Sequence, residues 1–155
     1  MAAFMNNSNA LESNMKTMKF KLLTLLILAA ASTASAKQVK SPHMYMFGLA
    51  ASFSDSTVYV TDIQDVPGAW YDTRSHFLMG RDNYSYQLKS YMADQQNQPN
   101  RVCTVFFSTN QKKAEKKYRK LLKKYTGKNT DGPIIHHLKS DNFKFEAIDF
   151  STEEQ

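Results

Sequence analysis

The sequence predicts an α+β fold, a two-layer sandwich in which two amphipathic helices cover one face of a mixed β-sheet. Two helical segments alternate with segments rich in β-branched and aromatic residues, which gives the order ββαβαββ along the chain. Strand–helix–strand connections favour parallel pairing, whereas the first two strands are close enough to form an antiparallel hairpin. The other face of the sheet is left for a long loop, the C-terminal segment or a partner.

The chain begins with the three parts of a secretory signal peptide. A basic segment at 19–21 precedes a ten-residue, largely apolar run at 22–31, and small residues at 32–36 form a cleavage site after Ala36. The apolar run is about half of the roughly 20 residues that span a bilayer. We therefore expect residues 1–36 to be an upstream extension, or a long basic region, followed by a cleaved signal peptide. The product would be periplasmic or secreted, with a bacterial envelope as the leading expectation.

The remainder, residues 37–155, is long enough for one globular domain: 155 residues less 36 leaves 119. Its first two strands are predicted at 44–53 and 57–63, joined by a turn of serines and Asp55 as an antiparallel hairpin. Gly48 inside the first strand indicates a bulge or a close backbone approach. A long connection follows at 64–81, with room for a short extra strand at 75–79.

A first helix is predicted from Asp82, a favourable N-cap, to Gln95. Its apolar residues share one face: Tyr84, Leu88, Tyr91 and Met92. The strand at 102–107 is apolar on both faces, which is typical of a central strand. It contains Cys103, the single cysteine, which we expect to be buried and which cannot form an internal disulfide.

The second helix has the clearest periodicity in the chain. Ser108 and Gln111 have capping-box spacing, and Gly127 is a favourable stop. One face is apolar and consists of Ala114, Tyr118, Leu121, Leu122 and Tyr125. Strands are then predicted at 134–138 and 143–147, the last of which alternates apolar and polar residues as a half-exposed strand does.

The outward surface of this second helix is almost entirely cationic. Two lines of basic side chains flank the apolar stripe: Lys112, Lys116, Arg119 and Lys123 on one side, and Lys113, Lys117, Lys120 and Lys124 on the other. Residues 110–128 hold nine basic residues and one acidic residue, whereas the rest of 37–155 holds eight basic and twelve acidic residues. The face is therefore a candidate docking surface for an anionic envelope polymer, lipid headgroups or an acidic protein. The alternative is a solvated face that keeps the protein soluble; nucleic acid is not expected as a ligand after export.

The long connection supplies a second candidate surface around the only tryptophan. Trp70, Tyr71 and Arg74 lie next to Asp72, and aromatic and charged neighbours of this kind are typical of stacking sites for a sugar or a peptide. The alternative is that Trp70 covers an open face of the sheet.

Catalytic signals are weak. The sequence has no HExxH or Cys/His zinc spacing, no nucleophile elbow and no glycine-rich phosphate loop, so neither a metal nor a cofactor is expected. His136 and His137 are adjacent on a predicted strand and should point to opposite faces. A small secreted hydrolase that uses loop carboxylates or a histidine is the alternative function. A pocket that brings together Asp72, His76 or Asp82 would favour it.

Residues 105–121, with the sequence VFFSTNQKKAEKKYRKL, resemble the strand-to-helix unit of SPOR domains. This resemblance covers about twenty residues and implies peptidoglycan binding as a further alternative. SPOR domains are built as βαββαβ, and no binding residue is carried over from them. The leading expectation is a non-catalytic binding protein of the envelope that uses the cationic helix face and the Trp70 loop.

Overall fold

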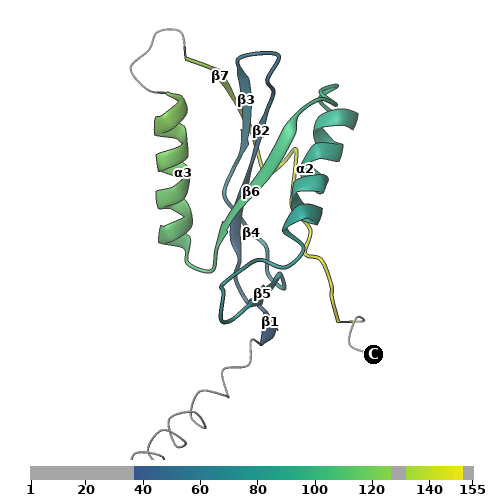
Figure 1. Cartoon of the computed structure of the whole chain (residues 1–155), viewed down its shortest axis with the longest axis vertical. Coiled ribbons are helices and arrows are strands. Elements are labelled where there is room, and N and C mark those ends of the chain that lie inside the picture. The colour runs from purple at the N-terminus through teal and green to yellow at the C-terminus, as the bar shows by residue number, and fades with distance from the viewer. Residues whose placement is uncertain (1–36, 127–131, 152–155) are drawn as a thin grey trace, which may run out of the picture. The chain divides into compact units, whose positions relative to one another are not determined.

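The strand at Tyr45–Ala51 lies at the centre of the fold, is buried on both faces, and has the rest of the fold arranged around it. The structure, a computed structural model, describes residues 37–126 and 132–151 (Figure 1). The main sheet has five strands: β2 (Tyr45–Ala51), β3 (Thr57–Thr61), β4 (Gln64–Asp65), β6 (Val102–Ser108) and β7 (Ile134–Leu138). β2 pairs antiparallel with β3, β4 and β6, and β7 pairs parallel with β3. The predicted α+β class, mixed sheet and opening hairpin are confirmed.

Helix α2 (Arg81–Asp94) begins after a glycine rather than at the aspartate expected to cap it. Gly80 is the N-cap and has a φ of 62°, in the left-handed region that favours glycine. Asp82 lies within the first turn, where a carboxylate interacts favourably with the helix dipole. Tyr84, Leu88 and Met92 are buried, as their spacing predicts.

Helix α3 (Gln111–Tyr125) is capped by Asn110, whose side-chain oxygen accepts a hydrogen bond from the backbone N–H of Lys113 at 3.0 Å. Ser108, the predicted cap, instead accepts a hydrogen bond from the Asn110 N–H at 3.2 Å and so supports the residue that caps the helix. The predicted stop, Gly127, lies outside the described residues.

The two helices lie on opposite faces of the sheet, so the predicted two-layer arrangement is wrong (Figure 1). Met46 and Ala50 of β2 pack in the core with α2, whereas Leu49 packs in the core with α3. The physical reason is the direction of the crossovers. The chain passes from β3 across β2 to β6, and then returns from β6 to β7 on the other side of β3. Two crossovers of the same hand that run in opposite directions place their helices on opposite faces.

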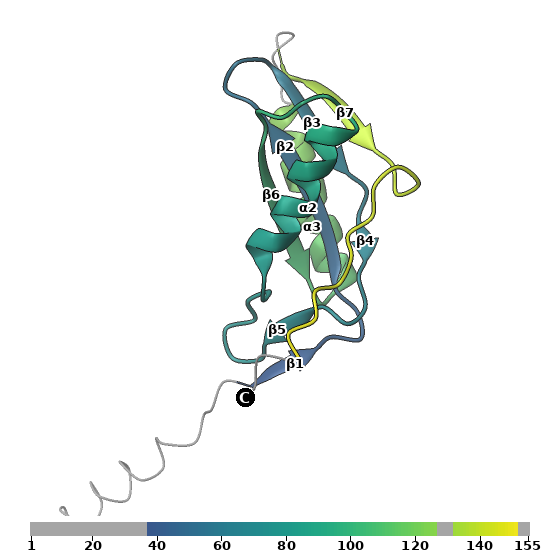
Figure 2. The same cartoon turned by 90° about the vertical axis from the view of Figure 1, so that its right-hand side faces the viewer.

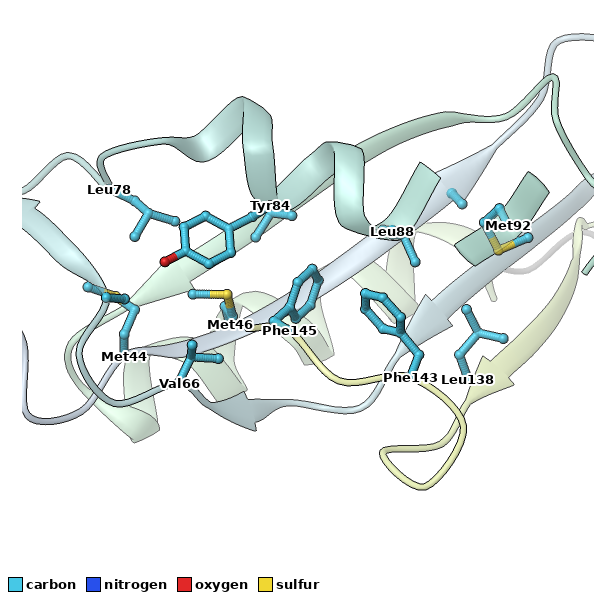
Figure 3. Packing of buried hydrophobic residues seen from close by; sticks show 13 residues of the cluster. Met44, Met46, Val66, Leu78, Tyr84, Leu88, Met92, Leu138, Phe143 and Phe145 are labelled. Atoms are coloured by element: carbon cyan, nitrogen blue, oxygen red, sulfur yellow. The ribbon is translucent and has the colours of Figure 1, made fainter. Parts of the chain in front are cut away.

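The larger core lies between α2 and the sheet (Figure 3). Its fully buried members include Met46, Tyr84 and Leu88. Gly48 faces this core, and a Cβ at that position would lie 2.5 Å from Leu88 Cδ2 and 3.1 Å from Phe145 Cζ. The predicted close backbone approach is therefore confirmed, because only glycine leaves room for the leucine.

The C-terminal segment at 143–148 runs alongside α2 as an extended strap rather than as a strand of the sheet (Figure 2). Side-chain amides take the place of strand neighbours. Gln64 donates to the Phe143 carbonyl and accepts from the Phe145 N–H, both at 2.9 Å. Gln87 makes the same pair of bonds to Glu146, both at 3.0 Å. The predicted alternation is present, since Phe143 and Phe145 are buried, but the predicted final strand is not.

A small second sheet forms from β1 (Gln38–Lys40) and β5 (Trp70–Asp72), which pair antiparallel. The short extra strand expected at 75–79 is therefore wrong, because the pairing segment lies earlier and only Leu78 bridges to Tyr71. Within residues 37–126 and 132–151, no helix has the length and apolar character that crossing a membrane requires. The expected signal peptide, at 1–36, lies outside the described residues.

Candidate functional site

The cationic face of α3 is fully presented to solvent. All eight basic side chains that were expected on this face are exposed: Lys112, Lys113, Lys116, Lys117, Arg119, Lys120, Lys123 and Lys124. The opposite stripe packs on the sheet, where the ring of Tyr118 meets Phe47 edge-on at a centroid distance of 5.0 Å. In the part of the chain that the structure describes, no carboxylate lies within ion-pair distance of any of the eight. The positive charge of the face is therefore not neutralised by ion pairs within this region.

One of these cations is tied to the sheet. The Lys117 ammonium donates a 2.7 Å hydrogen bond to the carbonyl of Phe107 in β6 and lies 5.5 Å from the centre of the Phe107 ring. Farther along the same strand, Arg81 Nε donates to the Val105 carbonyl at 3.3 Å. Among the described residues, both carbonyls belong to a strand that pairs with β2 alone, so the two cations satisfy acceptors on its unpaired side.

A pocket of about 220 Å³ lies where the cationic face meets the connection after β5. Its polar lining comes from two lysines of α3, the residues that precede the helix and one histidine: Lys113, Lys117, Ser108, Thr109 and His76. His76 has a φ of 55°, so a strained backbone holds its side chain here. This pocket has donors and no carboxylate in its lining, which suits an anionic group.

The second predicted surface, around Trp70, is only partly exposed to solvent. Trp70 and Tyr71 are half-buried in β5, and the Lys40 ammonium lies 5.3 Å from the centre of the Trp70 ring. The Trp70 Nε1 atom is buried and has no hydrogen-bond partner among the described residues. Arg74 is exposed in the turn that follows. The pocket beside this turn is lined by His76 rather than by Trp70, Tyr71 or Arg74, so the structure does not gather these three around it.

The three residues that would favour a hydrolase do not converge. Asp72 accepts hydrogen bonds from the N–H and hydroxyl of Ser75 and from the Arg74 N–H, and these bonds, the backbone bond from Ser75 first, hold the pKa of its carboxyl below the usual value. His76 lines the pocket at the start of α3. Asp82 lines a different, open hollow with Lys89 and Cys103. Each of the three therefore faces different surroundings.

A histidine–aspartate pair elsewhere was not predicted. His43 Nδ1 lies 2.6 Å from Asp65 Oδ2, and the other carboxylate oxygen accepts the Met44 N–H at 3.1 Å. The two residues are 22 positions apart, and only the pairing of β4 with β2 brings them together. No sequence signal could have found this pair. Ser41 lies nearby, but its hydroxyl donates to the His43 backbone carbonyl at 2.6 Å rather than to the ring.

Cys103 is half-buried rather than fully buried, which corrects the expectation for this residue. Its strand, β6, lies at the edge of the main sheet and not at the centre as its two-sided apolar character predicted. One side of the thiol therefore lies against the core and the other faces the hollow of Asp82. Burial raises the pKa of the thiol to about 11, and the thiol is therefore neutral at physiological pH. His136 and His137 do point to opposite faces, since the first stacks on Tyr59 and the second approaches Tyr118.

Comparison with known proteins adds no assignment. No family model matches the chain, and the searches of curated proteins and of solved structures likewise found no match. The order observed in the main sheet also differs from the βαββαβ order of SPOR domains. Among the described residues, no group of three or more His, Cys, Asp or Glu side chains is arranged to hold a metal ion. The function is therefore inferred from the geometry alone.

Proposed function

We propose that this chain is an exported, non-catalytic binding protein of the bacterial envelope that docks an anionic ligand on the outer face of α3. The observation that carries the proposal is the set of eight exposed basic side chains with no carboxylate at ion-pair distance among the described residues. An envelope polymer, lipid headgroups and an acidic protein all present repeated anionic groups at a surface. Repeated charge is what a rigid row of cations recognises.

The arrangement of the charges also opposes the helix. Five pairs of like charges are spaced i, i+4: 112/116, 113/117, 116/120, 119/123 and 120/124. Each pair destabilises an isolated helix by roughly 0.2–0.5 kcal/mol. A bound polyanion would relieve this repulsion, so binding and helix stability should increase together. A face that served only for solubility would not need its cations so close to one another.

The pocket at the start of α3 supports the same proposal. Lys113 and Lys117 line both the pocket and the cationic face, so one anionic group could lie in the pocket while its neighbours follow the helix. The Trp70 surface has a smaller role in the proposal, because Trp70 and Tyr71 are half-buried and are engaged by β1.

The test is a comparison of polyphosphate with sodium chloride at matched ionic strength. We expect polyphosphate to raise the Tm of the protein, whereas the salt alone gives a smaller shift from screening. A variant with Lys112, Lys116, Arg119 and Lys123 changed to glutamine should lose much of the difference between polyphosphate and salt, although Lys113 and Lys117 remain at the pocket.

The matched control removes four positive charges elsewhere, from Lys37, Lys89, Lys139 and Lys144, which are all exposed. This control should retain most of the polyphosphate effect although its net charge is the same. Equal Tm shifts from polyphosphate and salt in the parent protein, or equal losses in the two variants, would show only generic screening and would refute the proposal.

A further inference from the structure

Three exposed apolar residues lie at the same end of the main sheet. Among large hydrophobic residues, Phe53 is 99% exposed, Ile134 62% and Val102 58%. Val102 pairs with Ala51 at the end of β2, and Ile134 pairs with the first residue of β3. Phe53 lies in the turn that joins β2 to β3, and this turn is at the top of Figure 1. Single exposed apolar residues are ordinary, and Val102 and Ile134 lie on the two outermost strands at this end, so the distinctive feature is the nearly complete exposure of the Phe53 ring.

The turn that carries Phe53 is held firmly by its neighbours. Arg101 donates to both carboxylate oxygens of Asp55, at 3.0 and 2.9 Å, and to the Thr57 carbonyl at 2.6 Å. The Thr57 N–H in turn donates to Asp55 at 2.7 Å. These bonds fix the backbone that follows Phe53, so the exposed ring belongs to an ordered turn.

The same end of the molecule carries positive charge that forms no ion pair with a carboxylate of the described residues. Helix α3 ends there, with Lys123 and Lys124 exposed in its last turn (Figure 1). The carboxylate of Asp55 is neutralised by Arg101. Asp94, the last residue of α2, lies on the face of the sheet opposite α3. The positive charge beside the turn is therefore on the α3 face.

We propose that the β2–β3 turn is a membrane contact, in which Phe53 inserts at the boundary between headgroups and acyl chains while Lys123 and Lys124 contact lipid phosphates. This inference rests on the proposed function and names its ligand as the surface of an anionic phospholipid bilayer. An exposed aromatic ring beside lysines suits the bilayer interface, because the ring enters the apolar boundary and long basic side chains reach the phosphates. A soluble polyanion would use the lysines and leave Phe53 in water.

The direct test places a fluorescent reporter at the turn. Phe53→Trp is made in a Trp70→Phe background, so that the new tryptophan is the only one in the chain. We expect its emission to shift to the blue, and to be quenched by brominated acyl chains, when vesicles of phosphatidylglycerol and phosphatidylcholine are added. Phe77→Trp in the same background is the matched control, since Phe77 is 54% exposed and packs against Phe107, at the other end of β6 from Val102.

A second variant separates this inference from the proposed function. Phe53→Ser should leave the stability unchanged, because the side chain it removes is exposed. It should weaken binding to the anionic vesicles by about tenfold and leave polyphosphate binding unaltered. All variants are compared with the parent full chain, so that residues 22–31 are constant in every arm.

The outcomes are distinguishable. A parent protein that binds neither polyphosphate nor vesicles refutes the proposed function. Polyphosphate binding without vesicle binding, or vesicle binding that Phe53→Ser leaves unchanged, overturns the membrane contact alone. An equal blue shift at positions 53 and 77 would also overturn it, because the turn would then have no special place in the contact.

Discussion

Arg101 holds Asp55 through both guanidinium Nη atoms, one to each carboxylate oxygen, and so joins the start of β6 to the β2–β3 turn. The arginine is 5% exposed, and its guanidinium also lies 5.0 Å from the centre of the Tyr59 ring. A planar fork that donates in several directions and stacks on a ring is a role that lysine cannot fill.

Arg101→Lys should therefore destabilise the protein by about 1–3 kcal/mol, because the ammonium cannot replace all of these bonds at once. Urea unfolding measures the change. Arg119→Lys, at an exposed position of α3, is the matched control and should be close to neutral. If the two substitutions had equal effects, Arg101 would not be the clamp of the turn.

Removing charge from α3 should stabilise the protein at low salt even as it weakens polyanion binding. Replacing Lys112, Lys116, Arg119 and Lys123 by glutamine removes the repulsive pairs 112/116, 116/120 and 119/123. At roughly 0.2–0.5 kcal/mol per pair, the expected gain is about 0.6–1.5 kcal/mol. Thermal unfolding at low and high salt measures it, and the gain should shrink as salt screens the parent. A loss of stability at low salt would show that these cations have partners that stabilise the fold.

Gly48→Ala should destabilise the protein by about 1–3 kcal/mol, because the new methyl group would overlap Leu88 and press on Phe145. Leu88 is fully buried between α2 and the sheet and has little room to move. The double variant Gly48→Ala with Leu88→Val should cost less than the sum of the two single changes. Additive free energies of unfolding from chemical denaturation would argue against direct contact.

The two glutamines that hold the strap should differ in importance. Gln64 is buried and bonds two backbone groups of the strap, whereas the bonds of Gln87 are exposed to water. Gln64→Ala should cost about 2–4 kcal/mol and Gln87→Ala less than 1 kcal/mol. Hydrogen exchange at the Phe145 N–H, the donor to Gln64, should quicken only in the first variant. Comparable costs would indicate that the strap is held by its phenylalanines alone.

Cys103 should react slowly with alkylating reagents while the chain is folded. Thiolate is the reactive form, and a pKa of about 11 in place of 9.0 leaves roughly a hundredfold less of it at pH 8. The alkylation rate should rise about tenfold per pH unit up to about pH 11, whereas in urea it should level off near pH 9. A folded protein that reacts as fast as the unfolded one at pH 8 would contradict the raised pKa.

Local periodicity was enough to predict the elements that bury one face. The apolar spacing of Tyr84 and Leu88 in α2, and of Tyr118 in α3, predicts which residues face the sheet, and their burial agrees. The eight basic residues were found by the same argument. These features depend only on residues within one or two helical turns of each other, so the sequence carries them directly.

Features that depend on distant residues could not be predicted in this way. The strands were visible in the sequence, but which helix covers which face depends on the direction in which the chain crosses the sheet. The strap depends on Gln64, 79 residues before the Phe143 carbonyl that it bonds. The pairing of His43 with Asp65 likewise depends on strand register.

The outer side of β6 has a consequence for self-association. Arg81 and Lys117 occupy the carbonyls of Val105 and Phe107, which a neighbouring polypeptide would need as acceptors to lengthen the sheet. Growth of intermolecular fibrils from this strand would require both cations to be displaced first, so the molecule has a built-in barrier to such growth.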